Sequence, residues 1–134
     1  MPIVKGCKQL VEEASRKIRA IPVAEALAKH GNPNVVFVDL RDVRELERDG
    51  MITGALHAPR GMLEFWVDPE SPYYKEIFGS GKEFIFYCAA AWRSALATAT
   101  VQDMGLEPVC HLEGGFTEWK KRGGPVEQRA HKPA

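Results

Sequence analysis

Short runs of apolar residues recur along the chain, separated by stretches of mixed polarity. Residues 35–38 form one solid apolar run, and residues 84–87 form a second. Runs of this length without alternation are typical of strands that are buried on both faces of a sheet. Residues 109–112 predict a further short strand, and the apolar residues around Ala55 predict another.

Helical periodicity appears between these runs. Residues 10–18 place Leu10, Ala14 and Ile18 on one face and charged side chains on the opposite face, which predicts an amphipathic helix. Residues 61–78 have no clear period, and we expect a short helix mixed with a long loop there. Further helices are predicted after Pro22 and over residues 43–48, 94–104 and 116–121.

Strands that alternate with helices predict an α/β domain with a parallel central sheet. No repeat or interdomain linker interrupts the pattern. We therefore expect an N-terminal amphipathic helix extension over residues 1–19, one domain over residues 20–127 and a polar tail over residues 128–134, with fraying from Glu127. The N-terminal helix would either cover the domain or pair with a second copy as a homodimer.

Composition narrows the function. The 134 residues are 45% apolar and 27% charged, as in ordinary globular proteins. Eighteen basic and eighteen acidic residues cancel, which disfavours nucleic acid or an anionic membrane as a partner. No apolar run approaches the roughly 20 residues of a membrane span and no signal-peptide core is present, so we expect a cytoplasmic protein. Three cysteines without a CxxC pair and four scattered histidines predict no disulfide scaffold, metal site or cofactor.

The residues after the second apolar run are the most informative. Cys88 follows the predicted strand directly, small residues come next, and Arg93 and Ser94 begin a helix. Ligands of parallel sheets bind beyond the carboxyl ends of the strands. A backbone that curls around the thiol, the positive end of the helix dipole and Arg93 would each favour thiolate over thiol. The pattern predicts a reactive or anion-binding Cys88, with an inert buried cysteine as the alternative.

From about residue 21 to residue 126 the sequence resembles the rhodanese family. Residues 37–41 (Phe-Val-Asp-Leu-Arg) are similar to the family's apolar-Asp-x-Arg block, and residues 51–55 to its Gly-His-Ile-x-Gly-Ala block, with Met51 in place of histidine. Residues 88–94 resemble its Cys-x-x-Gly-x-Arg-Ser loop, with Ala91 in place of glycine. Residues 112–119, followed by Gly124-Pro125-Val126, resemble its terminal Gly-Gly-x-x-x-Trp signature.

The resemblance implies a sheet of about five parallel strands with helices on both faces, and a sulfurtransferase that forms a persulfide on Cys88. A small anionic donor such as thiosulfate or polysulfide would supply the sulfur, and a thiol or a cyanide-like acceptor would remove it, with ping-pong kinetics. Arg93 would bind the donor. Backbone N–H groups of the loop residues would hold the outer sulfur, and Trp92 would shape donor access; these residues are Ala89, Ala90, Ala91 and Trp92.

Loop length separates two chemistries within the fold. Four residues lie between Cys88 and Arg93, whereas related dual-specificity phosphatases have five, and the shorter ring favours sulfur over phosphate. If Ala91 needs a positive φ, the backbone there is strained by roughly 1 kcal/mol. A binding or regulatory module without turnover is the main alternative function, and an oxyanion reductase that uses Cys88 with Cys110 is a third.

Residues outside the loop receive supporting roles. We expect Asp39 and Ser94 to brace the loop. Arg41 would either add positive potential at the cleft mouth or join Asp39 in bracing. Arg60 would bind a long anionic donor or lie solvated at the surface, and Cys110 would pack in the core or act as a resolving thiol.

Overall fold

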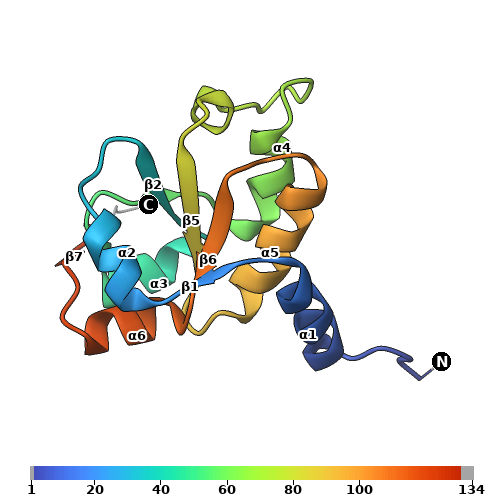
Figure 1. Ribbon diagram of the computed structural model, residues 1–134, viewed down its shortest axis with the longest axis horizontal. Helices are drawn as coiled ribbons and strands as arrows, with labels where there is room; N and C mark the ends of the chain where they lie inside the picture. The colour runs from blue at the N-terminus through green and yellow to red at the C-terminus, as the bar shows by residue number, and fades with distance from the viewer. Residues whose placement is uncertain (1, 131–134) are drawn as a thin grey trace.

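A five-stranded parallel sheet forms the centre of the molecule (Figure 1). The computed structural model describes residues 2–130, so most of the predicted tail, residues 131–134, lies outside the described residues. The α/β architecture and the parallel sheet are confirmed. The strands lie in the order β1 (Ala20–Ile21), β6 (Val109–Leu112), β5 (Glu83–Tyr87), β2 (Val35–Asp39) and β4 (Leu56–His57).

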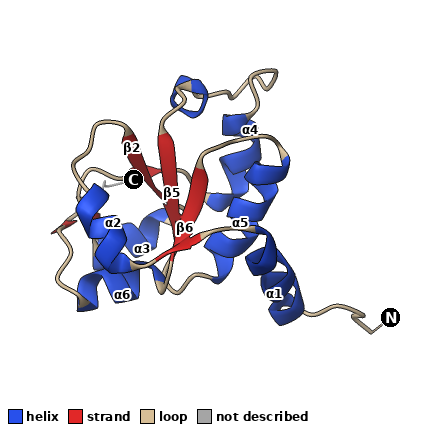
Figure 2. Ribbon diagram, viewed as in Figure 1, coloured by secondary structure: helices blue, strands red, loops and turns tan. Residues whose placement is uncertain are grey.

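Helices cover both faces of the sheet (Figure 2). On one side lie α2 (Val23–Lys29), α3 (Val43–Asp49) and α6 (Gly115–Lys121). On the other side lie α1 (Cys7–Lys17), α4 (Leu63–Val67) and α5 (Trp92–Asp103). Two 3₁₀ turns, Arg60–Met62 and Glu76–Gly79, flank the α4 region that lacked a clear period. Among the described residues, no helix is both long and apolar enough to cross a membrane.

Two separate cores pack against the two faces, because successive side chains of a strand point in opposite directions. Phe37, Ile85 and Tyr87 face the core that contains Trp119. Phe84 and Phe86 face the core on the α4 and α5 side. Fully burying a large apolar side chain stabilises a fold by about 1.5–3 kcal/mol, so the solid apolar runs stabilise both layers at once.

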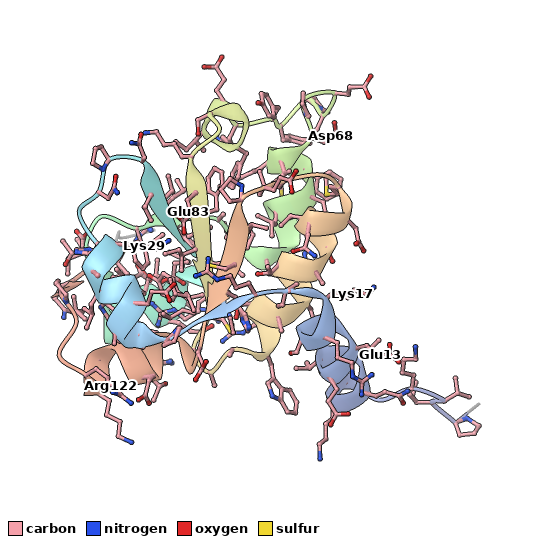
Figure 3. All side chains as sticks on the ribbon, viewed as in Figure 1. Glu13, Lys17, Lys29, Asp68, Glu83 and Arg122 are labelled. Atoms are coloured by element: carbon pink, nitrogen blue, oxygen red, sulfur yellow. The ribbon has the colours of Figure 1, made fainter. Side chains whose placement is uncertain are left out.

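The N-terminal helix α1 covers the domain itself. Its one buried residue, Ala14, packs against Ala95 and Ala99 of α5. Small side chains on both helices allow the two backbones to approach closely. At the other side of the sheet, Lys29 of α2 pairs with Glu83 at the start of β5, and both are labelled in Figure 3.

Three strands of two residues each were missing from the sequence prediction. One is β1, and the other two, β3 (Met51–Ile52) and β7 (Val126–Glu127), form a separate antiparallel ribbon. The expected fraying from Glu127 is wrong at that residue, because its carboxylate also accepts the Gly54 N–H at 2.6 Å. A strand of two residues has too few positions to display a period, and this explains the omission.

Candidate functional site

The Cys88 loop joins the carboxyl end of β5 to α5, close to the start of α6 (Figure 1). Cys88 is buried, with 1% of its surface exposed. Its Sγ accepts the backbone N–H of Ala91 at 3.2 Å and that of Ser94 at 3.4 Å. Ser94 lies in the first turn of α5, so the positive end of the helix dipole also faces the sulfur. The backbone therefore surrounds this thiol with groups that favour negative charge.

The first turn of α6 holds the other side of the loop. The Phe116 N–H donates to the Cys88 carbonyl at 2.8 Å, and the Thr117 N–H donates to the Ala89 carbonyl at 3.1 Å. Both carbonyls are thereby turned toward α6, and the N–H groups of Ala91 and Ser94 are left to face the sulfur.

Gly115 is what allows this approach. A Cβ at Gly115 would lie 2.6 Å from the Cys88 carbonyl oxygen and 2.7 Å from that of Ala89, closer than non-bonded atoms can come. Its φ of +61° also lies in the left-handed region. The second glycine of the terminal Gly-Gly block is therefore a packing requirement of the Cys88 loop.

Ala91 closes the loop in an unfavourable conformation. Its φ of 91° makes it the one non-glycine residue with a positive φ among residues 2–130. The condition under which the sequence predicted strain, a positive φ at Ala91, is therefore met. The left-handed backbone lets the Ala91 N–H reach the sulfur while its carbonyl accepts the Ala95 N–H at 3.1 Å and begins α5.

A buried pair beneath the loop supports Ala91. The Ser94 hydroxyl lies 3.2 Å from the Ala91 carbonyl oxygen and 2.9 Å from Nδ1 of His111 on β6. The Ser94 hydroxyl therefore connects the loop to β6. Burial lowers the pKa of His111, which keeps the ring neutral. Sequence reasoning missed His111: residues 109–112 were predicted as a strand, but no pattern along the chain indicated that this strand pairs with the one that leads to Cys88.

Arg41 and Asp39 form a buried pair at the end of β2. The Arg41 guanidinium donates to the Asp39 carboxylate at 2.7 and 3.0 Å and to the Gly50 carbonyl at 2.8 Å, and its central carbon lies 4.2 Å from the Phe116 ring centroid. Burial alone would lower the pKa of Arg41, but the hydrogen bond and charge of Asp39 raise it. With 1% of its surface exposed, Arg41 supports α6 from below, and the bracing alternative describes it better than anion binding at the cleft mouth.

Arg93 and Arg60 line a hollow of about 240 Å³ beside the loop, together with residues 40–42, Pro59 and Gly61. Each already has a carboxylate partner. Arg93 makes a two-pronged pair with Glu45 of α3, at 2.8 and 3.1 Å, and this contact raises the pKa of Arg93. Arg60 pairs with Glu64 at 2.7 Å. The structure thus brings both arginines to one hollow, but neither is an unpaired charge.

The other predicted loop residues lie at the surface. Trp92 is 52% exposed at the start of α5, Ala90 is exposed, and Ala89 is half-buried and lines a second hollow beside α6. The loop therefore presents a large aromatic side chain and small ones around a buried sulfur.

Cys110 lies too far from Cys88 to serve as its disulfide partner. In the sheet Ile85 pairs with Cys110, so Cys88 is three residues further along, a distance of about 10 Å at the usual rise of a strand. Disulfides need Cα atoms within about 7 Å. Burial also raises the pKa of the Cys110 thiol to about 11. The reductase that would use both thiols is excluded by this register. Within residues 2–130, no group of three His, Cys, Asp or Glu side chains is arranged to hold a metal ion.

The protein is thus an α/β protein with a parallel sheet, and a buried cysteine follows the central strand β5. The sulfur of this cysteine accepts backbone N–H groups from the loop after the strand. The chain matches the family model of the Rhodanese-like domain over residues 22–122. It belongs to that family.

Similar proteins carry several descriptions. A Rhodopseudomonas palustris protein of unknown function, described as a possible tyrosine phosphatase, has 53% identity and a TM-score of 0.92, with 95% of this chain and 98% of that chain covered. The polysulfide-sulfur transferase homodimer of Wolinella succinogenes has 27% identity and a TM-score of 0.68, with coverages of 95% and 90%.

Curated relatives differ in length. The dual specificity phosphatase Cdc25 of Arabidopsis thaliana is 27% identical, over 89% of this chain and 84% of the relative. The tRNA uridine(34) hydroxylase of Cronobacter sakazakii is 28% identical over 90% of this chain, which spans only 34% of that protein.

Gly115→Ala should distort the Cys88 loop. We expect the free energy of unfolding to fall by about 2–4 kcal/mol, because the new Cβ meets two backbone carbonyls in addition to the left-handed φ. Gly123→Ala is the matched control, since Gly123 also has a positive φ but open space around it; its cost should be about 1 kcal/mol. Urea unfolding measures both, and equal costs would contradict the steric argument.

Ala91→Gly should stabilise the protein by about 1 kcal/mol, because glycine adopts the left-handed backbone without the Cβ penalty. Ala89→Gly is the control: Ala89 has no positive φ, so glycine there should destabilise by about 0.5–1 kcal/mol. Chemical unfolding of the two variants beside the wild type tests the opposite signs. A destabilised Ala91→Gly protein would contradict the strain assigned to this residue.

His111 should make the protein less stable in mild acid. Its pKa in the folded state lies below the ordinary value of about 6.5, so as the pH falls below 6.5 the unfolded chain takes up a proton that the folded chain does not. Unfolding free energy should then fall by up to about 1.4 kcal/mol per pH unit until the folded-state pKa is reached. The unfolding free energy, measured by urea unfolding between pH 7 and pH 5, should change less with pH in His111→Gln than in the wild type. An unchanged slope would exclude His111 as its source.

Proposed function

We propose that the protein is a sulfurtransferase that carries sulfane sulfur as a persulfide on Cys88. One observation carries this proposal: Sγ of Cys88 accepts the backbone N–H groups of Ala91 and Ser94, in a loop with four residues between Cys88 and Arg93. Backbone N–H donors placed in this way stabilise negative charge on sulfur and would hold the outer sulfur of a persulfide. The Wolinella succinogenes sulfur transferase, similar over 95% of this chain, supports the same chemistry.

The first half-reaction charges the enzyme. The Cys88 thiolate attacks the outer, sulfane sulfur of thiosulfate, a new S–S bond forms, and sulfite leaves with the electron pair of the broken S–S bond. Polysulfide would react in the same way, with a shorter polysulfide as the leaving group. In the second half-reaction a thiol or cyanide takes the outer sulfur and releases the Cys88 thiolate.

Arg93 is proposed to hold the anionic donor in the hollow that it shares with Arg60. A guanidinium has five N–H groups, and the pair with Glu45 uses two of them. The remaining N–H groups can therefore bind an anion while Glu45 fixes the side chain. Trp92, exposed on the same loop, is proposed to limit the size of the donor that enters.

Phosphate-ester hydrolysis is the second candidate, since two similar proteins are described as phosphatases. The loop argues against it. Its two N–H donors lie 3.2 and 3.4 Å from the sulfur itself, and a ring with four residues between cysteine and arginine leaves little room for a tetrahedral oxyanion. A binding module without turnover uses the same fold, so the experiment below separates all three.

Cys88→Ser should abolish sulfur transfer and leave the fold intact, because the hydroxyl is a far poorer nucleophile than the thiolate. After incubation with thiosulfate or polysulfide and removal of excess donor, the intact mass of the wild-type protein should rise by about 32 Da, one sulfur atom, and that of Cys88→Ser should not. Cys7→Ser, which changes an exposed cysteine on α1, is the control and should still gain the sulfur.

The outcomes distinguish the three functions. Activity that survives Cys88→Ser would overturn the assignment of the nucleophile. A wild type that gains no sulfur but hydrolyses a phosphate ester would be a phosphatase. A wild type that does neither would be a binding module.

A further inference from the structure

A second hollow borders the Cys88 loop on the α6 side, away from Arg60 and Arg93. Its volume of about 500 Å³ is about twice the 240 Å³ of the hollow beside the arginines. Ala89 connects it to the loop, and one face of α6 forms most of its wall, through Phe116, Thr117, Lys120 and Lys121. The proposed donor hollow and this one therefore meet the loop at different residues, Arg93 and Ala89, and share Arg41 as a lining residue.

The charge of this hollow comes from its two lysines. Arg41, which also lines it, is neutralised by Asp39, and Asp49, another lining residue, is paired with Arg48 at 2.9 Å. Within the part of the chain that the structure describes, Lys120 and Lys121 form no ion pair within 4.0 Å. In a chain with a net charge of zero, this hollow has a local surplus of positive charge.

Size and lining select an organic anion over an inorganic one. Small-molecule pockets in proteins occupy about 300–1,000 Å³ and combine an apolar wall with a few polar groups. Phe116 is buried here, with 3% of its surface exposed, and its ring centroid lies 5.7 Å from Nζ of Lys120. The apolar part of the wall therefore comes mainly from Ala89 and the lysine stems. Thiosulfate has no apolar part to match this surface. The complementary ligand has a short carbon chain with a carboxylate at one end.

We propose that this hollow binds the acceptor of the second half-reaction, a small thiol that carries a carboxylate. The inference rests on the proposed sulfurtransferase function. Lys120 and Lys121 hold the carboxylate, the carbon chain lies along the stems of these lysines, and the thiol end reaches the loop beside Ala89. The acceptor thiolate attacks the outer sulfur of the Cys88 persulfide, the S–S bond to Cys88 breaks, and Cys88 leaves as the thiolate while the acceptor becomes a persulfide.

Matched acceptors test the subsite. Protein loaded with sulfur from polysulfide is mixed with 3-mercaptopropionate or with the neutral 3-mercapto-1-propanol, and loss of about 32 Da from the protein is followed over time. The carboxylated thiol should remove the sulfur about tenfold faster at low concentrations, which corresponds to about 1.4 kcal/mol and matches two exposed charge contacts together.

Charge reversal assigns this preference to α6. Lys120→Glu combined with Lys121→Glu should bring the ratio of the two rates to one or below, because the new carboxylates repel the carboxylated acceptor and not the neutral one. Lys8→Glu combined with Lys17→Glu is the control, because it changes the net charge equally on α1, where Figure 3 shows Lys17 far from Arg122 beside the end of α6. This control should keep the wild-type ratio.

A second measurement does not require a persulfide. Cys88 is alkylated with the anionic iodoacetate and the neutral iodoacetamide, and the ratio of the two rates at Cys88 is read by peptide mass. The α6 double variant should lower this ratio about tenfold relative to the α1 double variant. If no persulfide forms at all, the proposed function fails and the alkylation ratio alone decides whether the hollow attracts carboxylates. Ratios within twofold of the wild type for the α6 variant would overturn the subsite.

Discussion

Two hydrogen bonds from the first turn of α6 to the carbonyls of Cys88 and Ala89 set the shape of the whole site. Because these carbonyls are occupied on the α6 side, the N–H groups of Ala91 and Ser94 remain on the sulfur side. The other features follow from this constraint. A glycine is needed where α6 meets the carbonyls, and the loop can return to α5 only through a left-handed residue.

The charged residues around the site form two kinds of ion pair, one buried beneath the loop and one partly exposed beside it. Asp39 and Arg41 are buried partners that support Phe116, and the loop therefore rests on an ion pair that solvent does not reach. Arg93 forms an ion pair with Glu45, which also completes the capping box of α3. The position of Arg93 therefore depends on the start of a helix from another part of the chain. The negative charge that Cys88 would develop is stabilised chiefly by backbone groups, which need no rearrangement during a reaction.

The strands and the place of the Cys88 loop could be predicted from the sequence. The contacts between distant side chains could not, for physical reasons. Solid apolar runs identified β2, β5 and β6, and the position of Cys88 after β5 located the loop. Tertiary packing decides which partner a charged residue has. An arginine at the end of a strand could equally bind an anion at the surface, and Arg41 is instead buried against Asp39 and Phe116. His111 and Lys120 come to the site from elements later in the chain, and single-sequence patterns do not reveal which side chains meet across a sheet.

The dependence of the loop on α6 also bears on how the site is assembled during synthesis. Cys88 is made before Gly115, Phe116 and Thr117, so a growing chain passes through a stage at which the cysteine is present and the helix that orients its loop is not. Domains generally fold as units once their elements are available. Until then the carbonyls of Cys88 and Ala89 have water as a partner, and the N–H groups of Ala91 and Ser94 are not yet held against the Cys88 sulfur. The surroundings of the Cys88 thiol are therefore completed only after α6 has been made.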